Sequence, residues 1–142
     1  MTDVDLVNRK LVQLNEYITD LQGVQDCSLQ EFSGNKQLRR FVERTLHIAI
    51  ECALDIGNHI ISDNVWREPQ SNKDVFVVLC ENNIVSQNQS QSLQKMAQFR
   101  NLLVHDYARI DETILFGILK KNVNDLVEYV VAITSQLAHA AI

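Results

Sequence analysis

The residues of this chain that are best suited to chemistry lie close together between Phe99 and Tyr107. Arg100 carries a planar guanidinium group, which can hold two oxygen atoms of one anion at the same time. His105 carries an imidazole, and histidine without perturbing neighbours titrates at about pH 6.5, close to neutral. Together the two residue types predict proton transfer beside a bound anion such as a phosphate group.

A helix is predicted to carry Arg100. Ser86 and Gln89 have the spacing of a capping box, which indicates where this helix begins. The apolar residues that share one stripe of the helix are Leu93, Met96, Ala97 and Val104. Arg100 projects into this stripe, where an unpaired charge would be costly. Two interpretations stay open, because Arg100 either snorkels or forms a salt bridge, or it belongs to a site between packed helices.

Arg100 and His105 are five residues apart, which places them about 140° apart on an ideal helix. Their side chains can converge if the helix ends near Val104, or if two copies of the chain meet across a two-fold axis. The segment 106–110 has no helical stripe, and Asp111 is a suitable N-cap for the next helix. Asn101 and Asp106 are candidates to orient the reactive pair.

The order Arg100, four residues, His105, one residue, Tyr107 resembles the signature of the HepT toxins in the HEPN ribonuclease superfamily. The full sequence of this stretch, Arg-Asn-Leu-Leu-Val-His-Asp-Tyr, strengthens this resemblance. The segment 48–59 is similar to the family's long second helix. The similarity extends over roughly 6–137, which is nearly the whole chain.

This resemblance implies an endoribonuclease that works without a metal ion. A base takes the proton of a ribose 2′-hydroxyl, the oxygen attacks the adjacent phosphate, and a cation stabilises the charge that develops. His105 would be the base and Arg100 the cation, while Tyr107 could stack on a nucleobase or bind a phosphate oxygen. In similar HEPN proteins the site is built from two motifs across a dimer. The pair His47 and Glu51 lacks a third ligand at helical spacing, so no metal site is predicted, and no cofactor is expected.

The resemblance also implies a protein partner, the MntA nucleotidyltransferase, which acts as antitoxin and transfers AMP to the motif tyrosine, here Tyr107. Each AMP would add negative charge and a purine two residues from His105, where Arg100 could pair with the charge. A second function remains open, in which the chain is a non-catalytic helical partner that only binds substrate for a nucleotidyltransferase. RNA cleavage by the purified protein without metal separates the two.

The elements that must position these residues are all predicted to be helical. The 142 residues suit one domain, and one proline and four glycines leave long uninterrupted segments. We predict an all-α, HEPN-like bundle of about five helices that forms a two-fold dimer. Helical patterns cover 6–21, 38–62, 74–82, 86–104 and 111–121, with a last helix beyond Asn122 or Asn124 and a tail that frays from about 138. The segment 28–32 is either a helical turn or a loop.

The longest predicted helix, 38–62, is apolar around more than half of its circumference and should lie at the centre of the bundle. Its narrow polar arc includes Arg40, Arg44, His47, Glu51 and Asp55. This arc is either a solvated stripe with pairs four residues apart, or a face on which Glu51 and Asp55 lean toward the motif and orient Arg100.

The formal net charge of −5 argues against a broadly basic nucleic-acid surface, so RNA affinity would have to come from local patches and from dimerisation. One such cluster comprises Lys36, Arg39, Arg40 and Arg44, although ordinary solvated helix surface is the simpler explanation for it. The three cysteines are widely spaced and indicate reduced thiols. Together with the lack of a spanning segment and of a signal-peptide core, this predicts a cytoplasmic protein.

Overall fold

The computed structural model describes residues 3–105 and 111–140, and every regular element among them is a helix. The described residues contain seven helices: α1 (Val4–Gln22), α2 (Leu29–Gly34), α3 (Lys36–Asp63), α4 (Asn72–Glu81), α5 (Gln87–His105), α6 (Glu112–Lys121) and α7 (Val123–Ala140). The prediction of an all-α fold is confirmed. The described residues contain more helices than the approximate five that the sequence predicts, chiefly because short segments such as 29–34 form helices of their own.

Side chains at the helix starts explain why the boundaries fall where they do. A side-chain oxygen of the cap residue accepts a hydrogen bond from a backbone N–H in the first turn, which the helix itself cannot satisfy. Such caps are Asp3 for α1, Ser28 for α2, Asn35 for α3, Ser71 for α4 and Asp111 for α6. The segment after α1 becomes helical because Ser28 and Glu31 form a complete capping box and Phe32 is buried.

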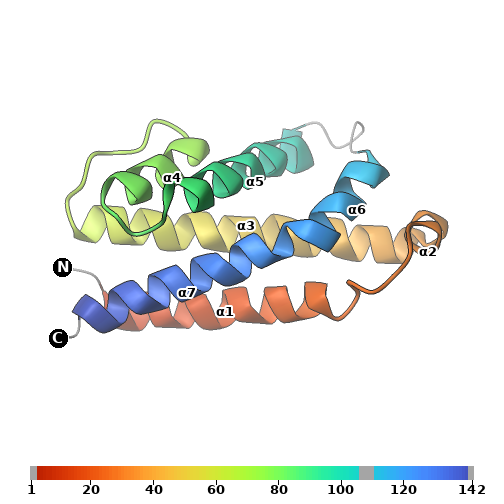
Figure 1. Cartoon of the computed structure of the whole chain (residues 1–142), viewed down its shortest axis with the longest axis horizontal. Helices are drawn as coiled ribbons and strands as arrows, with labels where there is room; N and C mark the ends of the chain where they lie inside the picture. Colours follow the sequence, from red (N-terminus) through yellow and green to blue (C-terminus); the bar gives the residue numbers. More distant parts are fainter. Residues whose placement is uncertain (1–2, 106–110, 141–142) are drawn as a thin grey trace.

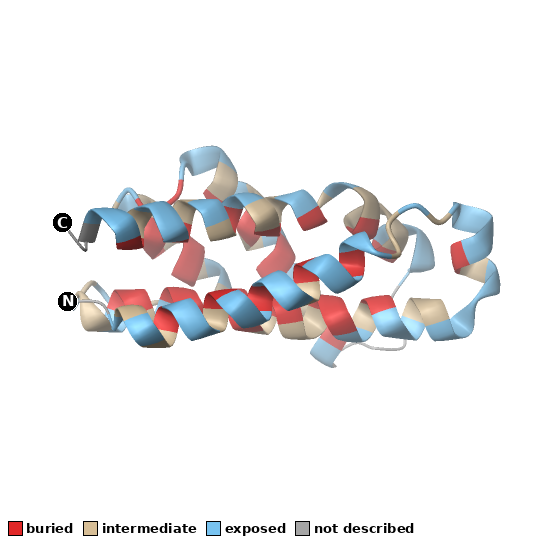
Figure 2. Ribbon diagram, turned by 90° about the horizontal axis from the view of Figure 1, so that it is seen from below, coloured by how far each residue is buried: buried red, intermediate tan, exposed pale blue. Residues whose placement is uncertain are grey.

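The long helix α3 lies at the centre of the molecule, as its apolar sequence predicts. Figure 1 shows α3 running along the long axis, with α1 and α7 on one side and the pair α4 and α5 on the other. The buried residues follow the inner faces of the helices, as Figure 2 shows. Not every apolar side chain of α3 is buried. Phe41 is 42% exposed.

Gly57 allows α4 to pack closely against the C-terminal part of α3. A Cβ atom at this position would lie 2.7 Å from Cγ1 of Val75 and 3.3 Å from the hydroxyl oxygen of Tyr129. That hydroxyl is buried and donates a hydrogen bond to the carbonyl oxygen of Ala53 at 2.8 Å. Burial raises the pKa of Tyr129 far above its ordinary range, so this phenol stays protonated and keeps its donor role.

The turn after α3 is held by its own backbone and by Trp66. Val65 has φ 56°, a left-handed conformation that is uncommon for a β-branched residue. The N–H of Trp66 donates to the carbonyl oxygen of Ile61 at 3.1 Å, and its side chain packs against the core. Trp66 therefore anchors this loop on the core.

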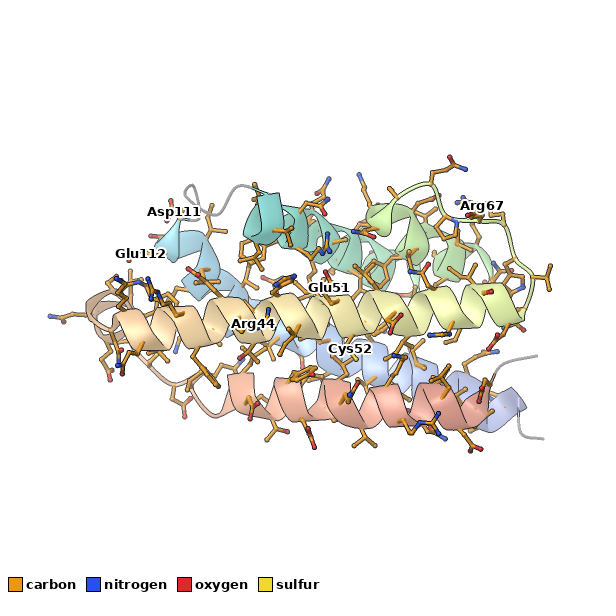
Figure 3. All side chains as sticks on the ribbon, turned by 180° about the vertical axis from the view of Figure 1, so that it is seen from behind. Arg44, Glu51, Cys52, Arg67, Asp111 and Glu112 are labelled. Carbon is orange, nitrogen blue, oxygen red and sulfur yellow. The ribbon has the colours of Figure 1, made fainter. Side chains whose placement is uncertain are left out.

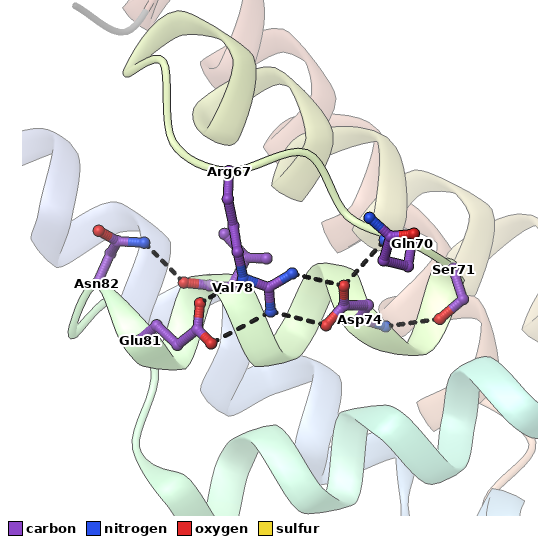
Figure 4. A network of polar contacts seen from close by, with 7 residues as sticks. All are labelled: Arg67, Gln70, Ser71, Asp74, Val78, Glu81 and Asn82. Atoms are coloured by element: carbon purple, nitrogen blue, oxygen red, sulfur yellow. Dashed lines mark hydrogen bonds and ion pairs between the residues drawn. The ribbon is translucent and has the colours of Figure 1, made fainter.

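Arg67 fastens the same loop to α4. Its guanidinium forms paired hydrogen bonds of 2.7 and 2.9 Å with the carboxylate of Asp74, and its Nε donates to Glu81 at 2.8 Å. The N–H of Gln70 also donates to Asp74, so the loop is held at two points (Figure 4). These hydrogen bonds lower the pKa of Asp74 to about 2.

No helix in the described part of the chain is long and apolar enough to cross a membrane.

Candidate active site

The helix that carries Arg100 begins where the sequence predicts. Ser86 and Gln89 form both hydrogen bonds of a capping box, at 2.8 and 3.1 Å. The buried apolar residues of this helix are Leu93, Met96, Ala97, Phe99 and Leu103. Val104 was expected on the same stripe, but it is 40% exposed. Val104 lies in the last turn of α5, one residue before the helix ends at His105.

Arg100 is bound to the central helix by one carboxylate. Its Nε donates to Oε1 of Glu51 at 2.5 Å, and Nη2 forms an ion pair with the same oxygen. Nη1 donates to Oδ1 of Asn101 at 3.3 Å. The side chain is 20% exposed, so Arg100 is salt-bridged and also lies at a contact between two packed helices. The interpretation of Arg100 as a salt-bridged side chain is confirmed, and its membership of a site stays a prediction.

Glu51 contacts a second basic side chain. Oε1 of Glu51 lies 3.4 Å from Nε2 of His47, one turn earlier in α3. Of the two interpretations of the polar arc, the contact with Arg100 favours for Glu51 the one in which it leans toward the motif. One oxygen atom therefore links His47 to Arg100. The carboxylate restricts the guanidinium on its Nε and Nη2 side, and the remaining N–H groups can bind an anion.

Asp55 has other partners. Its carboxylate lies 2.5 Å from Nζ of Lys10 on α1 and 3.8 Å from Nε2 of His59. No contact joins Asp55 to Arg100 within the described residues, because Asp55 lies one turn further along α3, where α1 supplies the nearest positive charge. Both residues nevertheless line the same cavity.

That cavity has a volume of about 430 Å³ and lies between α1, α3 and α5. Its lining combines two acidic and two basic side chains with three neutral amides: Glu51, Asp55, Lys10, Arg100, Gln13, Asn58 and Asn72. Cys52 also faces it, and burial raises the pKa of this thiol to about 11, so the thiol stays protonated at neutral pH. Figure 3 shows Glu51 and Cys52 on the two edges of α3 that face α5 and α1 respectively.

A second cavity, of about 520 Å³, lies beyond His47 toward the start of α3. It is lined by Arg40, Glu43, Arg44, His47 and Leu103. The contact between Glu51 and Arg100 therefore has an open cavity on each side along α3. Sequence analysis missed this arrangement, because it depends on how α5 crosses α3.

The remaining predicted site residues lie five to seven residues after Arg100 in the chain. His105 is the last residue of α5. The side chain of His105, and all of Asp106 and Tyr107, lie outside the described residues. The described His, Cys, Asp and Glu side chains include no group of three or more placed to hold a metal ion.

This fold and this motif are those of a known class of RNA-cutting helical proteins. The sequence model of the family described as ribonuclease HepT-like matches residues 14–133. The chain therefore belongs to the ribonuclease HepT-like family. The HEPN-type fold and the ribonuclease family predicted from the motif around Arg100 are confirmed.

Individual relatives are similar over almost their whole length. The mRNA nuclease HepT of Shewanella oneidensis is 29% identical over 132 residues, which cover 93% of this chain and 98% of that protein. The tRNA nuclease HepT of Aphanizomenon flos-aquae is 24% identical, covering 96% and 95%. A solved structure of tri-AMPylated HEPN toxin from S. oneidensis, in complex with MNT antitoxin, matches with a TM-score of 0.84 and 29% identity, covering 95% of this chain and 99% of that one.

Proposed function

We propose that this protein is the RNA-cutting toxin of a toxin–antitoxin pair, and that it cleaves RNA without a metal ion. The observation that carries the proposal is the contact between Glu51 and Arg100. It holds a guanidinium in the wall of one open cavity, five residues before His105, and Glu51 also contacts His47, which lines a second cavity. A fixed cation beside a group that titrates near neutral pH is what phosphodiester cleavage by a ribose hydroxyl requires.

In the proposed reaction, His105 removes the proton from a ribose 2′-hydroxyl. The 2′-oxygen attacks the adjacent phosphorus, and the bond to the 5′-oxygen of the next nucleotide breaks. The leaving oxygen takes up a proton, and the products are a 2′,3′-cyclic phosphate and a 5′-hydroxyl end. Arg100 would bind the non-bridging oxygens as their charge increases, while Asn101 and Glu51 keep the guanidinium in place.

A two-fold dimer would bring two copies of the motif together. Phe41 on α3, with Leu102 and Val104 on α5, are apolar and exposed. They lie on the two helices that build the site, so a second copy could bury them and add its own arginine and histidine.

The cognate partner is proposed to be an MntA-type nucleotidyltransferase that transfers AMP to Tyr107. The tyrosine oxygen would attack the α-phosphorus of ATP, and pyrophosphate would leave. The attached nucleotide would then occupy the RNA site beside Arg100, and toxicity would stop. The related toxin in the solved complex is described as tri-AMPylated and bound to its antitoxin, which supports this proposal. Three cysteines without disulfides are consistent with action in the cytoplasm.

The deciding experiment is RNA cleavage by the purified protein in the presence of EDTA. We expect wild-type protein to cut single-stranded RNA, and His105→Ala and Arg100→Ala to lose at least about 100-fold in rate. Circular dichroism and melting curves check that both variants stay folded, because Arg100 also contributes to packing. If neither variant loses activity, the mechanism is wrong. If the folded wild-type protein cuts no RNA, the chain is a non-catalytic partner of the nucleotidyltransferase.

A further inference from the structure

A line of basic side chains runs along α3 from the reactive site toward the start of that helix. Arg44 and Arg40 are four residues apart, so they lie on one face, separated by one turn. Both line the cavity of about 520 Å³ that also contains His47 and Leu103. Figure 3 shows Arg44 on α3 at some distance from Glu51, on the side of the molecule where Asp111 and Glu112 begin α6.

The basic cluster at the start of α3 contains two kinds of arginine. Arg39 donates to the carbonyl oxygen of Phe32 at 3.1 Å and lies 3.6 Å from Glu112, so it fastens α2 and α6 to α3. Arg40 and Arg44 are exposed and form no hydrogen bond or ion pair with any residue of the described part of the chain. Their charges are therefore available to a ligand, opposed within the cavity only by Glu43.

The cavity lies next to the reactive site. His47 forms part of its wall and contacts the same oxygen of Glu51 that binds Arg100. Leu103, which forms the opposite wall, precedes His105 by two residues. Arg44 lies about 10 Å from Glu51 along the helix axis. A strand whose reacting phosphate lies at Arg100 would therefore pass over Arg44 and Arg40 within the next few nucleotides.

We propose that the cavity formed by Arg40, Arg44, His47 and Leu103 binds the sugar–phosphate backbone of single-stranded RNA next to the scissile bond. This proposal rests on the proposed ribonuclease function, and it assigns substrate binding to this part of the surface. The net charge of −5 makes such a local site necessary, because the surface as a whole repels a polyanion. The contacts are to phosphates and carry no base preference.

The first test measures binding apart from cleavage. The His105→Ala protein is titrated into a fluorescently labelled 20-nucleotide RNA of mixed sequence, with and without Arg40→Gln plus Arg44→Gln. We expect the double change to weaken binding about 10-fold and to reduce the salt slope of log K by about 1.4, the value for two single-strand phosphates. The charge-retaining pair Arg40→Lys and Arg44→Lys should keep most of the affinity.

The matched control removes two positive charges elsewhere. Arg9 and Lys73 are exposed, have no partner in the described part of the chain, and line neither cavity. Arg9→Gln plus Lys73→Gln should leave affinity and salt slope nearly unchanged. Equal losses in the two pairs of variants would mean that only the total charge matters, and would overturn the inference.

The second test measures cleavage with His105 intact. Arg40→Gln plus Arg44→Gln should raise KM for the 20-nucleotide RNA about 10-fold while kcat stays within about twofold, because the reacting groups are untouched. If wild-type protein cleaves RNA and the double variant has the same KM, the inference is wrong while the proposed function stands. If wild-type protein neither binds nor cleaves RNA, the proposed function itself fails, and the inference fails with it.

Discussion

Oε1 of Glu51 accepts a hydrogen bond from Nε of Arg100 at 2.5 Å. This contact joins α3 to α5 through two residues that are 49 positions apart in the sequence. The same oxygen lies 3.4 Å from His47. A guanidinium that is held on one side loses less conformational freedom when it binds an anion on the other. The contact therefore assigns Glu51 a positioning role in the proposed reaction.

We predict that Glu51→Gln lowers kcat for RNA cleavage about 10-fold and changes KM little, because Arg100 is still present but less well placed. Cleavage rates measured over a range of RNA concentrations up to saturation give kcat and KM for both proteins. Glu16→Gln, an exposed change on α1, is the control and should behave like wild type. A change in KM alone, with kcat preserved, would show that Glu51 serves binding and does not position the reacting groups.

We predict that Tyr107 is the residue modified by the cognate nucleotidyltransferase. Incubation with antitoxin, ATP and Mg²⁺ should add one or more AMP units to wild-type protein and none to Tyr107→Phe, which keeps the ring but lacks the acceptor oxygen. Intact mass spectrometry measures this directly. Labelling of both proteins would place the acceptor elsewhere, with Tyr17 the next candidate, because Tyr129 is fully buried and hydrogen-bonded.

We predict a homodimer that buries Phe41, Leu102 and Val104. Sedimentation at micromolar concentration should give about twice the chain mass of 16.3 kDa. Phe41→Asp plus Leu102→Asp should shift the protein toward the monomer and reduce cleavage. Val12→Asp plus Val131→Asp, which alters two apolar residues exposed on other helices, is the control. A wild-type protein that sediments only as a single chain contradicts this arrangement.

Two glycines in helix interiors should respond in opposite directions to alanine. Gly57→Ala should destabilise the fold by roughly 1–3 kcal/mol, because the new methyl group would lie 2.7 Å from Val75. Gly117 has nothing within 4 Å of its Cβ position, so Gly117→Ala should stabilise the fold by about 0.5–1 kcal/mol through helix propensity. Urea unfolding of the two variants beside wild type measures both changes. If Gly57→Ala instead stabilises the fold, α4 can shift away from α3 without losing free energy of unfolding.

The contact between Arg67 and Asp74 should make stability depend on acid pH. The pKa of Asp74 is lowered from 3.8 to about 2 in the folded protein, so its contribution is complete above about pH 4 and is lost as the pH falls through 2. Asp74→Asn should cost about 1 kcal/mol at pH 7, because Arg67 is 43% exposed and water screens the pair. Melting temperature against pH should then fall less steeply between pH 4 and 2. Glu68→Gln, in the same loop, should keep the wild-type slope.

The sequence by itself determined the motif and every long helix. A cap such as Ser71, a capping box such as Ser86 with Gln89, and an apolar spacing of three and four are local signals, and each lies within a few residues of the structure it specifies. The order Arg100, His105 and Tyr107 is also a local pattern, and it indicated the family correctly.

Only the tertiary structure decided which distant side chains meet. The spacing of Glu51 and Asp55 places both on one arc of α3. In the structure, however, Glu51 pairs with Arg100 on α5, and Asp55 pairs with Lys10 on α1. The basic cluster at the start of α3 was likewise divided, since Arg39 binds α2 and α6 whereas Arg40 and Arg44 line a cavity. Charge pairing depends on distance in space, and the crossing of α5 and α1 over α3 sets those distances through packing that no local pattern encodes.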